Sequence, residues 1–258
     1  MYIYQLCKSL QDKIIIIHKM KHLLSQETRL NFEQVSTATI ATALFKAGFK
    51  NQYLQDVSPL NIHGKNMVGQ AFTLRYIPAR EDRNGIEVFR NPDHPQRIAV
   101  ETCPEGSVLI IDSRKNARAA SAGSILVTRL MKRGVAGIVT DGGFRDSAEI
   151  AELEFSSFQN RASAPTNLTL HEALDINIPI ACGDVAVFPG DVVVGDADGV
   201  IIVPFEIADN LSADCLKMTL FEDYVLYRVQ NGSPVIGLYP LTDPGIKKDF
   251  EKWKSERA

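Results

Sequence analysis

The sequence predicts an α/β fold, and three features of the chain indicate it. From residue 106 onward, short apolar runs alternate with helical patterns in the order strand, helix, strand, helix, which is typical of βαβ units. The second half holds several short β-type runs separated by Gly, Asp and Pro, and residues 206–229 have the length and spacing of one long helix. With 258 residues and 45% hydrophobic content, we expect one large domain rather than two small ones.

The residues before 106 contain patterns that predict a helix, a strand and a loop. Residues 33–48 carry apolar side chains at near-helical spacing and end at Gly48, as an amphipathic helix with a C-terminal glycine does. Residues 67–76 mix β-branched, aromatic and glycine residues and are expected to form the first core strand. Residues 77–98 are polar, contain three prolines and predict a long loop or lid, which is a kind of segment that usually carries function or disorder.

The βαβ region contains the motif that suggests chemistry. The stretch TDGGFRDS, residues 140–147, follows a predicted strand and precedes a predicted helix. Because ligands bind at the carboxyl ends of parallel strands, we expect this stretch to line a site. The predicted strands are 107–112, 135–140, 179–182, 185–188, 192–194 and 200–203, and the predicted helices are 119–133, 147–153 and 206–229.

Composition disfavours several classes of protein. The formal net charge of −3 and the pI near 6.0 lack the basic excess that binds nucleic-acid phosphates. The four cysteines are widely scattered without a CxxC pair, so neither a zinc ribbon nor a disulfide framework is expected; they are Cys7, Cys103, Cys182 and Cys215. The apolar run at residues 14–17 is far too short to span a membrane. We therefore expect a soluble, cytoplasmic protein, for which Met20 is an alternative start.

The motif TDGGFRDS allows a structural and a functional interpretation. Asp146 with Glu149 fits a helix cap completed by a capping box, worth about 1 kcal/mol. A cap leaves Arg145 unexplained, because the positive end of a helix repels a cation. An adjacent Arg and Asp can hold a carboxylate through the guanidinium and a divalent cation through a carboxylate oxygen. The two glycines would allow a tight turn and the close approach of a ligand.

A second candidate is AASAGSIL, residues 119–126. In the structural interpretation Ser121 or Ser124 caps the following helix. In the functional interpretation the helix start binds a carboxylate or phosphate through backbone N–H groups, those of Gly123, Ser124, Ile125 and Leu126. Neither the GxxxxGK[ST] nor the GxGxxG pattern is present, so nucleotide binding of those two kinds is not indicated.

The remaining candidates favour structural roles. Three aspartates, 191, 196 and 198, do not have the spacing of a calcium-binding loop, and the valines around them favour a turn between strands. The five histidines are peripheral or isolated and are expected to be surface or structural residues: His18, His22, His63, His94 and His171. Ser124 lacks the context of a nucleophile elbow, which disfavours a Ser-His-Asp hydrolase.

Three segments together resemble a known family. They are VGQAFTLRY (68–76), ASAGSILVTRLMKRGVAGIVTDGGFRDSAEI (120–150) and PGDVVVGDADGVIIVP (189–204). They are similar to the family that contains the regulator of ribonuclease E activity A and the class II 4-hydroxy-4-methyl-2-oxoglutarate aldolases. The resemblance spans roughly residues 35–230. It implies a β/β/α fold like the phosphohistidine swivelling domain over residues 33–232, an N-terminal extension (1–32), a C-terminal tail (233–258), and trimers or hexamers with active sites between subunits.

The resemblance also implies roles for individual residues. In the aldolases the aspartate of the RD pair, here Asp146, binds Mg²⁺ or Mn²⁺, and the arginine, here Arg145, contacts the pyruvyl portion of the substrate. The amides of residues 123–126 would take the substrate carboxylate. An acidic residue on the late helix of a neighbouring subunit reaches the metal through water, and Glu222 is the candidate here.

This chain departs from the aldolases at one position. They carry an Asp or Glu after the helix-start glycine, where this chain has Ser124, 21 positions before Arg145. That acid normally orders a metal-bound water for proton transfer. Together with the long 77–98 segment and the C-terminal tail, the change predicts a divergent subgroup with a different substrate.

The leading hypothesis is a metal-dependent lyase that acts on a small 2-oxo acid through a pyruvate enolate, without membrane or direct nucleic-acid partners. Aldol cleavage, decarboxylation and dehydration of a sugar acid all remain open. The main alternative is a non-enzymatic regulator of ribonuclease E, and a third is a binding module or methyltransferase. Three arginines near the long loop are candidates to contact the far end of the substrate: Arg75, Arg80 and Arg83.

Overall fold

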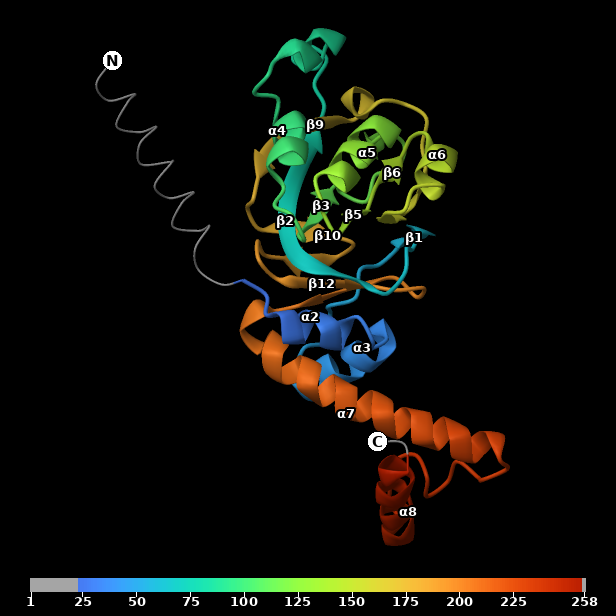
Figure 1. Ribbon diagram of the computed structural model, residues 1–258. Coiled ribbons are helices and arrows are strands. Elements are labelled where there is room, and N and C mark those ends of the chain that lie inside the picture. The colour runs from blue at the N-terminus through green and yellow to red at the C-terminus, as the bar shows by residue number, and fades with distance from the viewer. Residues whose placement is uncertain (1–22, 257–258) are drawn as a thin grey trace, which may run out of the picture.

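The computed structural model describes residues 23–256 (Figure 1). Cys7, Met20, His18, His22 and the apolar run at 14–17 lie outside the described residues. No helix within the described part has the length and apolar character needed to cross a membrane.

The core is an eight-stranded mixed sheet. Its centre is parallel and consists of β2 (Met67–Pro78), β3 (Val108–Asp112), β5 (Gly137–Thr140) and β7 (Ser156–Gln159). One edge is β1 (Ser58–Asn61), antiparallel to β7, and the other is the antiparallel pair β12 (Val192–Gly195) and β13 (Val200–Val203). The predicted strands at 67–76, 107–112, 135–140, 192–194 and 200–203 are confirmed to within two residues.

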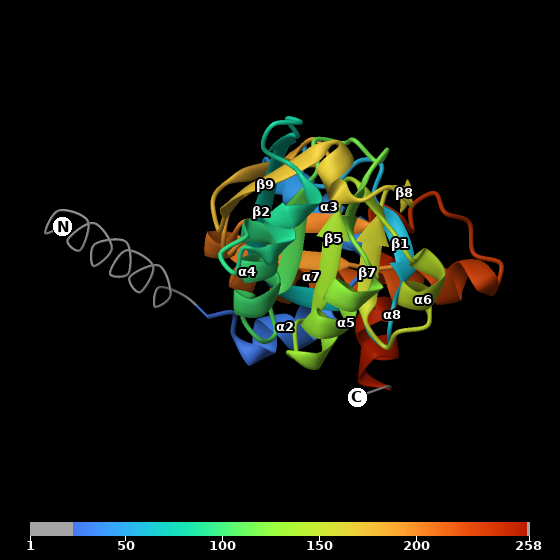
Figure 2. The ribbon, with the colours of Figure 1, turned by 90° about the horizontal axis from the view of Figure 1, so that it is seen from above.

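The sheet lies between a layer of helices and a small hairpin. Figure 2 shows α4 (Pro95–Thr102), α5 (Ser124–Lys132) and α6 (Ser147–Ala151) on one face. The hairpin β10 (Ile180–Cys182) and β11 (Val185–Val187) covers the other. Successive strand residues point to opposite faces, so β3 places Leu109 and Ile111 in the helix-side core and Val108 and Ile110 in the hairpin-side core. The predicted β/β/α architecture is confirmed.

A third core cluster joins the two ends of the chain. α2 (Gln26–Phe32), α3 (Thr37–Lys46) and α7 (Phe205–Gln230) pack against β12 and β13, and Phe32 is fully buried there. The helix predicted over 33–48 starts too early. The observed helix begins at Thr37, because the Ser36 side chain caps it by accepting a hydrogen bond from Thr39 N–H. α8 (Pro244–Ser255) packs against the distal part of α7, where Trp253 and Tyr224 have ring centroids 5.5 Å apart.

Two further predictions need correction. The segment 77–98 is not a plain loop, because it contains the 3₁₀ helix η1 (Ile86–Arg90) and the first turn of α4. The helix predicted over 119–133 begins as a strand, β4 (Ala120–Ala122), and becomes helical only after Gly123, which is extended at φ −130° and ψ 176°.

Strand β4 belongs to a second tier of strands that the sequence analysis did not foresee. It pairs in parallel with β6 (Gly143–Phe144), which pairs in parallel with β8 (Arg161–Ala162). The chain enters these strands after leaving β3, β5 and β7 respectively, so the small sheet lies past the carboxyl ends of the main one. Strand β9 (His171–Ile176), also unpredicted, pairs with the second half of β2, whereas β12 pairs with the first half.

The aspartate-rich segment 188–204 forms a turn between strands, as predicted. Asp196 is buried at this turn, and its carboxylate accepts hydrogen bonds from Thr37 N–H at 2.7 Å and Thr37 hydroxyl at 2.8 Å. It also accepts from Asp198 N–H at 2.9 Å. The carboxylate thereby joins the β12–β13 turn to the start of α3.

We expect Asp196→Asn to lower the free energy of unfolding by about 1–3 kcal/mol, because an amide cannot accept all of these hydrogen bonds and leaves buried donors unpaired. Chemical denaturation measures the change. Asp198→Asn is the matched control, because the Asp198 side chain is exposed, and it should change the free energy of unfolding by less than about 0.5 kcal/mol. Equal losses in the two variants would contradict this role of Asp196.

Candidate active site

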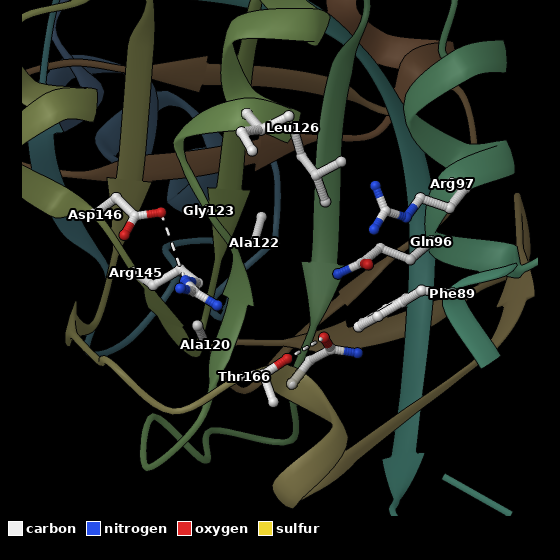
Figure 3. Close-up of a pocket in the computed structure, with 12 residues that line it drawn as sticks. Phe89, Gln96, Arg97, Ala120, Ala122, Gly123, Leu126, Arg145, Asp146 and Thr166 are labelled. Atoms are coloured by element: carbon white, nitrogen blue, oxygen red, sulfur yellow. Dashed lines mark hydrogen bonds and ion pairs between the residues drawn. The ribbon is translucent and has the colours of Figure 1, made fainter. Parts of the chain in front are cut away.

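A pocket of about 210 Å³ lies at the carboxyl edge of the parallel sheet, beside the second tier of strands (Figure 3). One wall comes from β4, the start of α5 and the Arg145–Asp146 pair, and the other from η1, α4 and η2 (Asn167–Thr169). A cavity of this size suits a small organic acid, since pockets for drug-sized ligands measure roughly 300–1,000 Å³. Arg145 and Asp146 of the motif TDGGFRDS therefore line a pocket, at the edge where a site was expected.

The glycines of the motif are required by neighbouring protein atoms. A Cβ on Gly142 would lie 2.6 Å from both Ser113 Cβ and Ser121 Oγ, and one on Gly143 would lie 2.6 Å from Arg161 carbonyl oxygen. Such contacts are far inside van der Waals distance, so only glycine fits. We expected these glycines to allow the close approach of a ligand. In the structure they allow the close packing of the second tier of strands.

A buried cluster of hydroxyl groups holds this junction together. Ser121 Oγ lies 2.6 Å from Thr140 Oγ1 and 2.7 Å from Ser113 Oγ, and all three residues are fully buried. Thr140 Oγ1 also accepts from Gly142 N–H at 2.9 Å. The cluster connects β4, β5 and the residue after β3, and Ser121 lies between the pocket residues Ala120 and Ala122.

The neighbouring Asp141 is buried and does not line the pocket. Its carboxylate accepts from the backbone N–H groups of Ser113 at 2.7 Å, Lys115 at 3.0 Å and Gly183 at 3.2 Å. Burial raises the pKa of Asp141 to about 6, and the nearby Asp112 carboxylate acts in the same direction, whereas the three amides oppose the shift. Its role is to join the loop after β3 and the β10–β11 turn to the motif.

Asp146 has the left-handed conformation, with φ 58° and ψ 38°, at the residue before α6. Its side chain makes no cap hydrogen bond, so the helix-cap interpretation is wrong. Its Oδ2 instead lies 3.5 Å from Arg145 Nε and 3.4 Å from both Ser124 N and Ser124 Oγ. Both members of the pair are partly exposed and line the pocket, as Figure 3 shows. A non-glycine residue in this conformation is uncommon, and Asp is among those that tolerate it best.

The start of α5 supplies part of the expected anion site. The residue before the helix is Gly123 and its side chain can offer no cap, so neither Ser121 nor Ser124 caps α5. Leu126 N–H bonds to Gly123 carbonyl oxygen at 3.1 Å and is used by the chain itself. Among the described residues, Ile125 N–H has no hydrogen-bond partner, as is usual for the first turn of a helix. Ser124 N–H donates to Asp146 Oδ2 at 3.4 Å, so Ile125 N–H is the group left free to meet an anion.

The opposite wall comes partly from the 77–98 segment, which was expected to contact the far end of the substrate, but through residues that were not predicted. It contains Phe89, Gln96, Arg97, Thr166 and Asn167. The arginines proposed from the sequence do not line the pocket: Arg75 is paired with Asp175, Arg80 with Asp82, and Arg83 with Glu172. A signal for Arg97 existed, since a cation in the first turn of a helix that begins at Pro95 is as unexpected as Arg145 before α6.

Glu222 does not belong to this pocket within one chain. It lies on α7, which runs past α2 and α3 on the side of the molecule remote from α5 and α6 (Figure 1). Its carboxylate accepts from Thr39 hydroxyl at 2.7 Å and Tyr239 hydroxyl at 3.3 Å. A role in the site would therefore need a neighbouring subunit.

The donor set at Asp146 suits a metal ion shared with a substrate. Within residues 23–256, no three His, Cys, Asp or Glu side chains gather in a way that could enclose a metal ion. Mg²⁺, however, is commonly held by one or two carboxylates, while waters and substrate oxygens complete its coordination. Asp146 provides one carboxylate at the pocket, beside the Ser124 hydroxyl. The residues thus fit an open Mg²⁺ or Mn²⁺ site.

Two of the described histidines, His171 and His94, serve the fold. His171 is fully buried, stacks on Tyr76 at 5.5 Å, and has Nδ1 3.1 Å from Arg114 Nη2 and Nε2 3.0 Å from Asn116 carbonyl oxygen. Burial, with the Arg114 charge, lowers the pKa of His171 to about 4. His94 precedes α4 and meets Phe89 edge to face at 5.3 Å; burial lowers its pKa as well.

Fold and site together define a β/β/α protein in which an Arg–Asp pair and a helix start face a small pocket. A family model described as RraA-like, Aldolase/RraA, matches residues 37–202, and the chain belongs to this family.

Individual relatives carry two kinds of name. A protein of Halalkalibacterium halodurans, named "Putative 4-hydroxy-4-methyl-2-oxoglutarate aldolase", is 38% identical over 177 residues, which is 67% of this chain and 74% of that protein. Streptomyces coelicolor RraAS2, described as an unusual member of the RNase ES inhibitor RraA protein family, has a similar structure with TM-score 0.69 and 26% identity over 79% of this chain and 98% of its own. An uncharacterized protein from Pseudomonas syringae shares the fold, with TM-score 0.71 and 20% identity over 85% of this chain and all of its own.

We expect His171 to make stability sensitive to acid. Its folded-state pKa of about 4 lies below the ordinary value of 6.5, so its contribution is present above pH 6.5 and is lost as the pH falls through 4. The loss amounts to about 3 kcal/mol. In denaturation at pH 7, 5.5 and 4, the difference in free energy of unfolding between wild type and His171→Gln should shrink with falling pH; a constant difference would contradict this assignment.

Proposed function

We propose that this protein is a divalent-metal-dependent lyase that acts on a small 2-oxo acid through a pyruvate enolate. The observation that carries the proposal is the Arg145–Asp146 pair, which lies beside the start of α5 on one wall of a small pocket. The family membership and the aldolase name of a relative with 38% identity support it.

Each group has a task in this chemistry. Ile125 N–H holds the carboxylate of the 2-oxo acid, aided by the positive end of α5, and Ser124 N–H, which donates to Asp146 at 3.4 Å, lies beside it. Arg145 places its guanidinium beside the 2-oxo oxygen, where negative charge grows as the enolate forms. Asp146 holds Mg²⁺ or Mn²⁺, which when bound supplies a Lewis acid for the same oxygen. Arg145 also orients Asp146, since their side chains are 3.5 Å apart.

The reaction type depends on proton transfer. Aldol cleavage requires a base to take the proton of the 4-hydroxyl group, whereas decarboxylation does not. Among the residues that line the pocket, Asp146 is the one acid and there is no histidine, and Ser124 stands where the aldolases have a carboxylic acid. We propose that an aldol reaction takes its base from a neighbouring subunit in a trimer or hexamer, with Glu222 as the candidate. The exposed Ile125 at the pocket is a surface that such a subunit would cover.

The described cysteines fit the cytoplasm as the proposed location. Cys103, Cys182 and Cys215 are buried and form no disulfide. Burial raises the pKa of Cys103 to about 12, which keeps its thiol protonated.

The test is turnover of oxaloacetate and of a 4-hydroxy-2-oxo acid by the purified full chain, with and without Mg²⁺ or Mn²⁺. We expect metal-dependent release of pyruvate and a loss of about 100-fold or more in kcat/KM for Asp146→Asn, which tolerates the left-handed backbone but lacks the charge. Glu149→Gln, on the exposed side of α6, is the control and should keep full activity.

Absence of turnover with every 2-oxo acid, with and without metal, would reject the lyase. The relative described as a member of an RNase ES inhibitor family then makes inhibition of ribonuclease E the next assay. Inhibition that persists in Asp146→Asn would identify a regulator that does not use this pocket. Dehydration of sugar acids belongs in the same substrate panel, because it passes through a comparable enolate.

A second test displaces the side chains of Arg145 and Asp146 without replacing either residue. A Cβ on Gly123 would lie 2.7 Å from Arg145 Cγ and 2.9 Å from Asp146 Oδ2, so Gly123→Ala must displace both side chains. The extended backbone of Gly123 accepts alanine, and the fold should survive. We expect an unchanged melting temperature and a fall of roughly 10- to 100-fold in kcat, since misplacement by about 1 Å can cost 10²-fold. Full activity would show that the pair does not need its present position.

A further inference from the structure

Arg97 stands in the pocket without a carboxylate partner. Among residues 23–256 it forms no ion pair, and its Nε is buried without a hydrogen-bond partner. A buried donor left unpaired is costly, and a guanidinium more so. By contrast, Arg83 from the same part of the chain pairs with Glu172 at 3.0 Å. The unpaired state of Arg97 therefore points to an anion that comes from outside the chain.

The surrounding residues hold Arg97 in place. Its guanidinium carbon lies 4.9 Å from the centre of the Phe89 ring, a cation–π contact that orients the flat group. The preceding residue, Gln96, donates to Ser121 carbonyl oxygen at 2.8 Å and to Tyr76 hydroxyl at 2.9 Å. These buried bonds join the first turn of α4 to β2 and β4, so Arg97 is presented by a rigid support.

A second unpaired donor lines the same wall. Asn167 is only 5% exposed, and its Nδ2 has no hydrogen-bond partner, while its Oδ1 accepts from Thr166 hydroxyl at 3.3 Å. Native structures rarely leave a buried amide nitrogen unsatisfied. Arg97 and Asn167 belong to two separate elements, α4 and η2, and both line one cavity.

Charge and arrangement indicate the ligand. Figure 3 shows Arg97 and Arg145 on opposite sides of the pocket, with both guanidinium groups directed inward. The lining residues hold two arginines and one aspartate, a net charge of one positive before any metal binds. One carboxylate is assigned to the start of α5 and Arg145, which leaves Arg97 and Asn167 for a second anionic group at the far end of the molecule.

We propose that Arg97 is the specificity-determining residue for a second carboxylate, and that Phe89 and Asn167 complete its binding site. This inference rests on the proposed function for the identity of the first carboxylate. The protein then prefers 2-oxo acids with a carboxylate at both ends over those with one. The 77–98 segment, together with the first turn of α4, serves as the wall that selects the substrate's far end.

Binding of two matched acids tests the inference without turnover. 2-Oxoglutarate and 2-oxopentanoate have the same chain length and differ by one carboxylate, and their affinities are measured by calorimetry in the presence of Mg²⁺. We expect wild type to bind 2-oxoglutarate roughly 10- to 100-fold more tightly. In Arg97→Met the preference should fall to within about threefold, and Arg97→Lys should be intermediate because it keeps the charge but loses the planar fork. Arg80→Met, outside the pocket, should behave as wild type.

Steady-state kinetics distinguish the selection of substrates by Arg97 from a purely structural role of this residue. For 4-hydroxy-2-oxoglutarate, Arg97→Met should raise KM with little change in kcat, and for 4-hydroxy-2-oxopentanoate neither constant should change, because the contact is remote from the reacting bond. Equal losses with both substrates, a preference retained in Arg97→Met, or no preference in wild type would overturn the inference. Selective binding without any turnover would reject the lyase and leave the second-carboxylate site standing, whereas binding of neither acid would reject both.

Discussion

The site depends on the packing of two tiers of strands at one edge of the sheet. Gly142 and Gly143 leave no Cβ, and the space is taken by Ser113, Ser121 and the backbone of Arg161. The buried hydroxyl cluster of Ser113, Ser121 and Thr140 then joins the tiers. Any side chain at either glycine would push the tiers apart, and with them the two helix starts to which the proposed chemistry is assigned. The close approach of backbone to backbone is therefore the constraint from which the pocket follows.

Asp141 extends this constraint to the hairpin layer. Its carboxylate collects N–H donors from the loop after β3 and from the β10–β11 turn, so the three layers meet one residue before the glycines. The backbone then reaches Asp146 in a left-handed conformation, which places the carboxylate beside Ser124 rather than over α6. The charged pair thus owes its direction to a rigid junction, as a site that must stabilise developing charge requires.

The two walls of the pocket differ in origin. The Arg145 wall comes from crossovers of the parallel sheet, an arrangement that places ligands at the carboxyl edge in many α/β proteins. The Arg97 wall comes from the segment between β2 and β3 and from η2. It contains the two buried donors without a partner, Arg97 Nε and Asn167 Nδ2. If the proposed enolate chemistry belongs to the Arg145 wall and the proposed selection to the Arg97 wall, changes in the Arg97 wall would alter the substrate without altering the reaction.

Periodicity and turn residues were enough to predict the parallel strands β2, β3 and β5, the β-rich second half and the long α7, because these patterns are local, but β1 and the parallel strand β7 were not predicted. The motif at 140–147 and its place at a strand end were likewise readable, since an arginine and two aspartates beside glycines conflict with a plain helix cap. The second tier escaped prediction because β4, β6 and β8 are two or three residues long and form only where the main strands end. Strand β9 and the Arg97 wall escaped because their partners, β2 and the pocket, are distant in sequence. Local patterns thus determined the framework and one half of the site, whereas the other half was decided by contacts that exist only once the sheet has brought remote segments together.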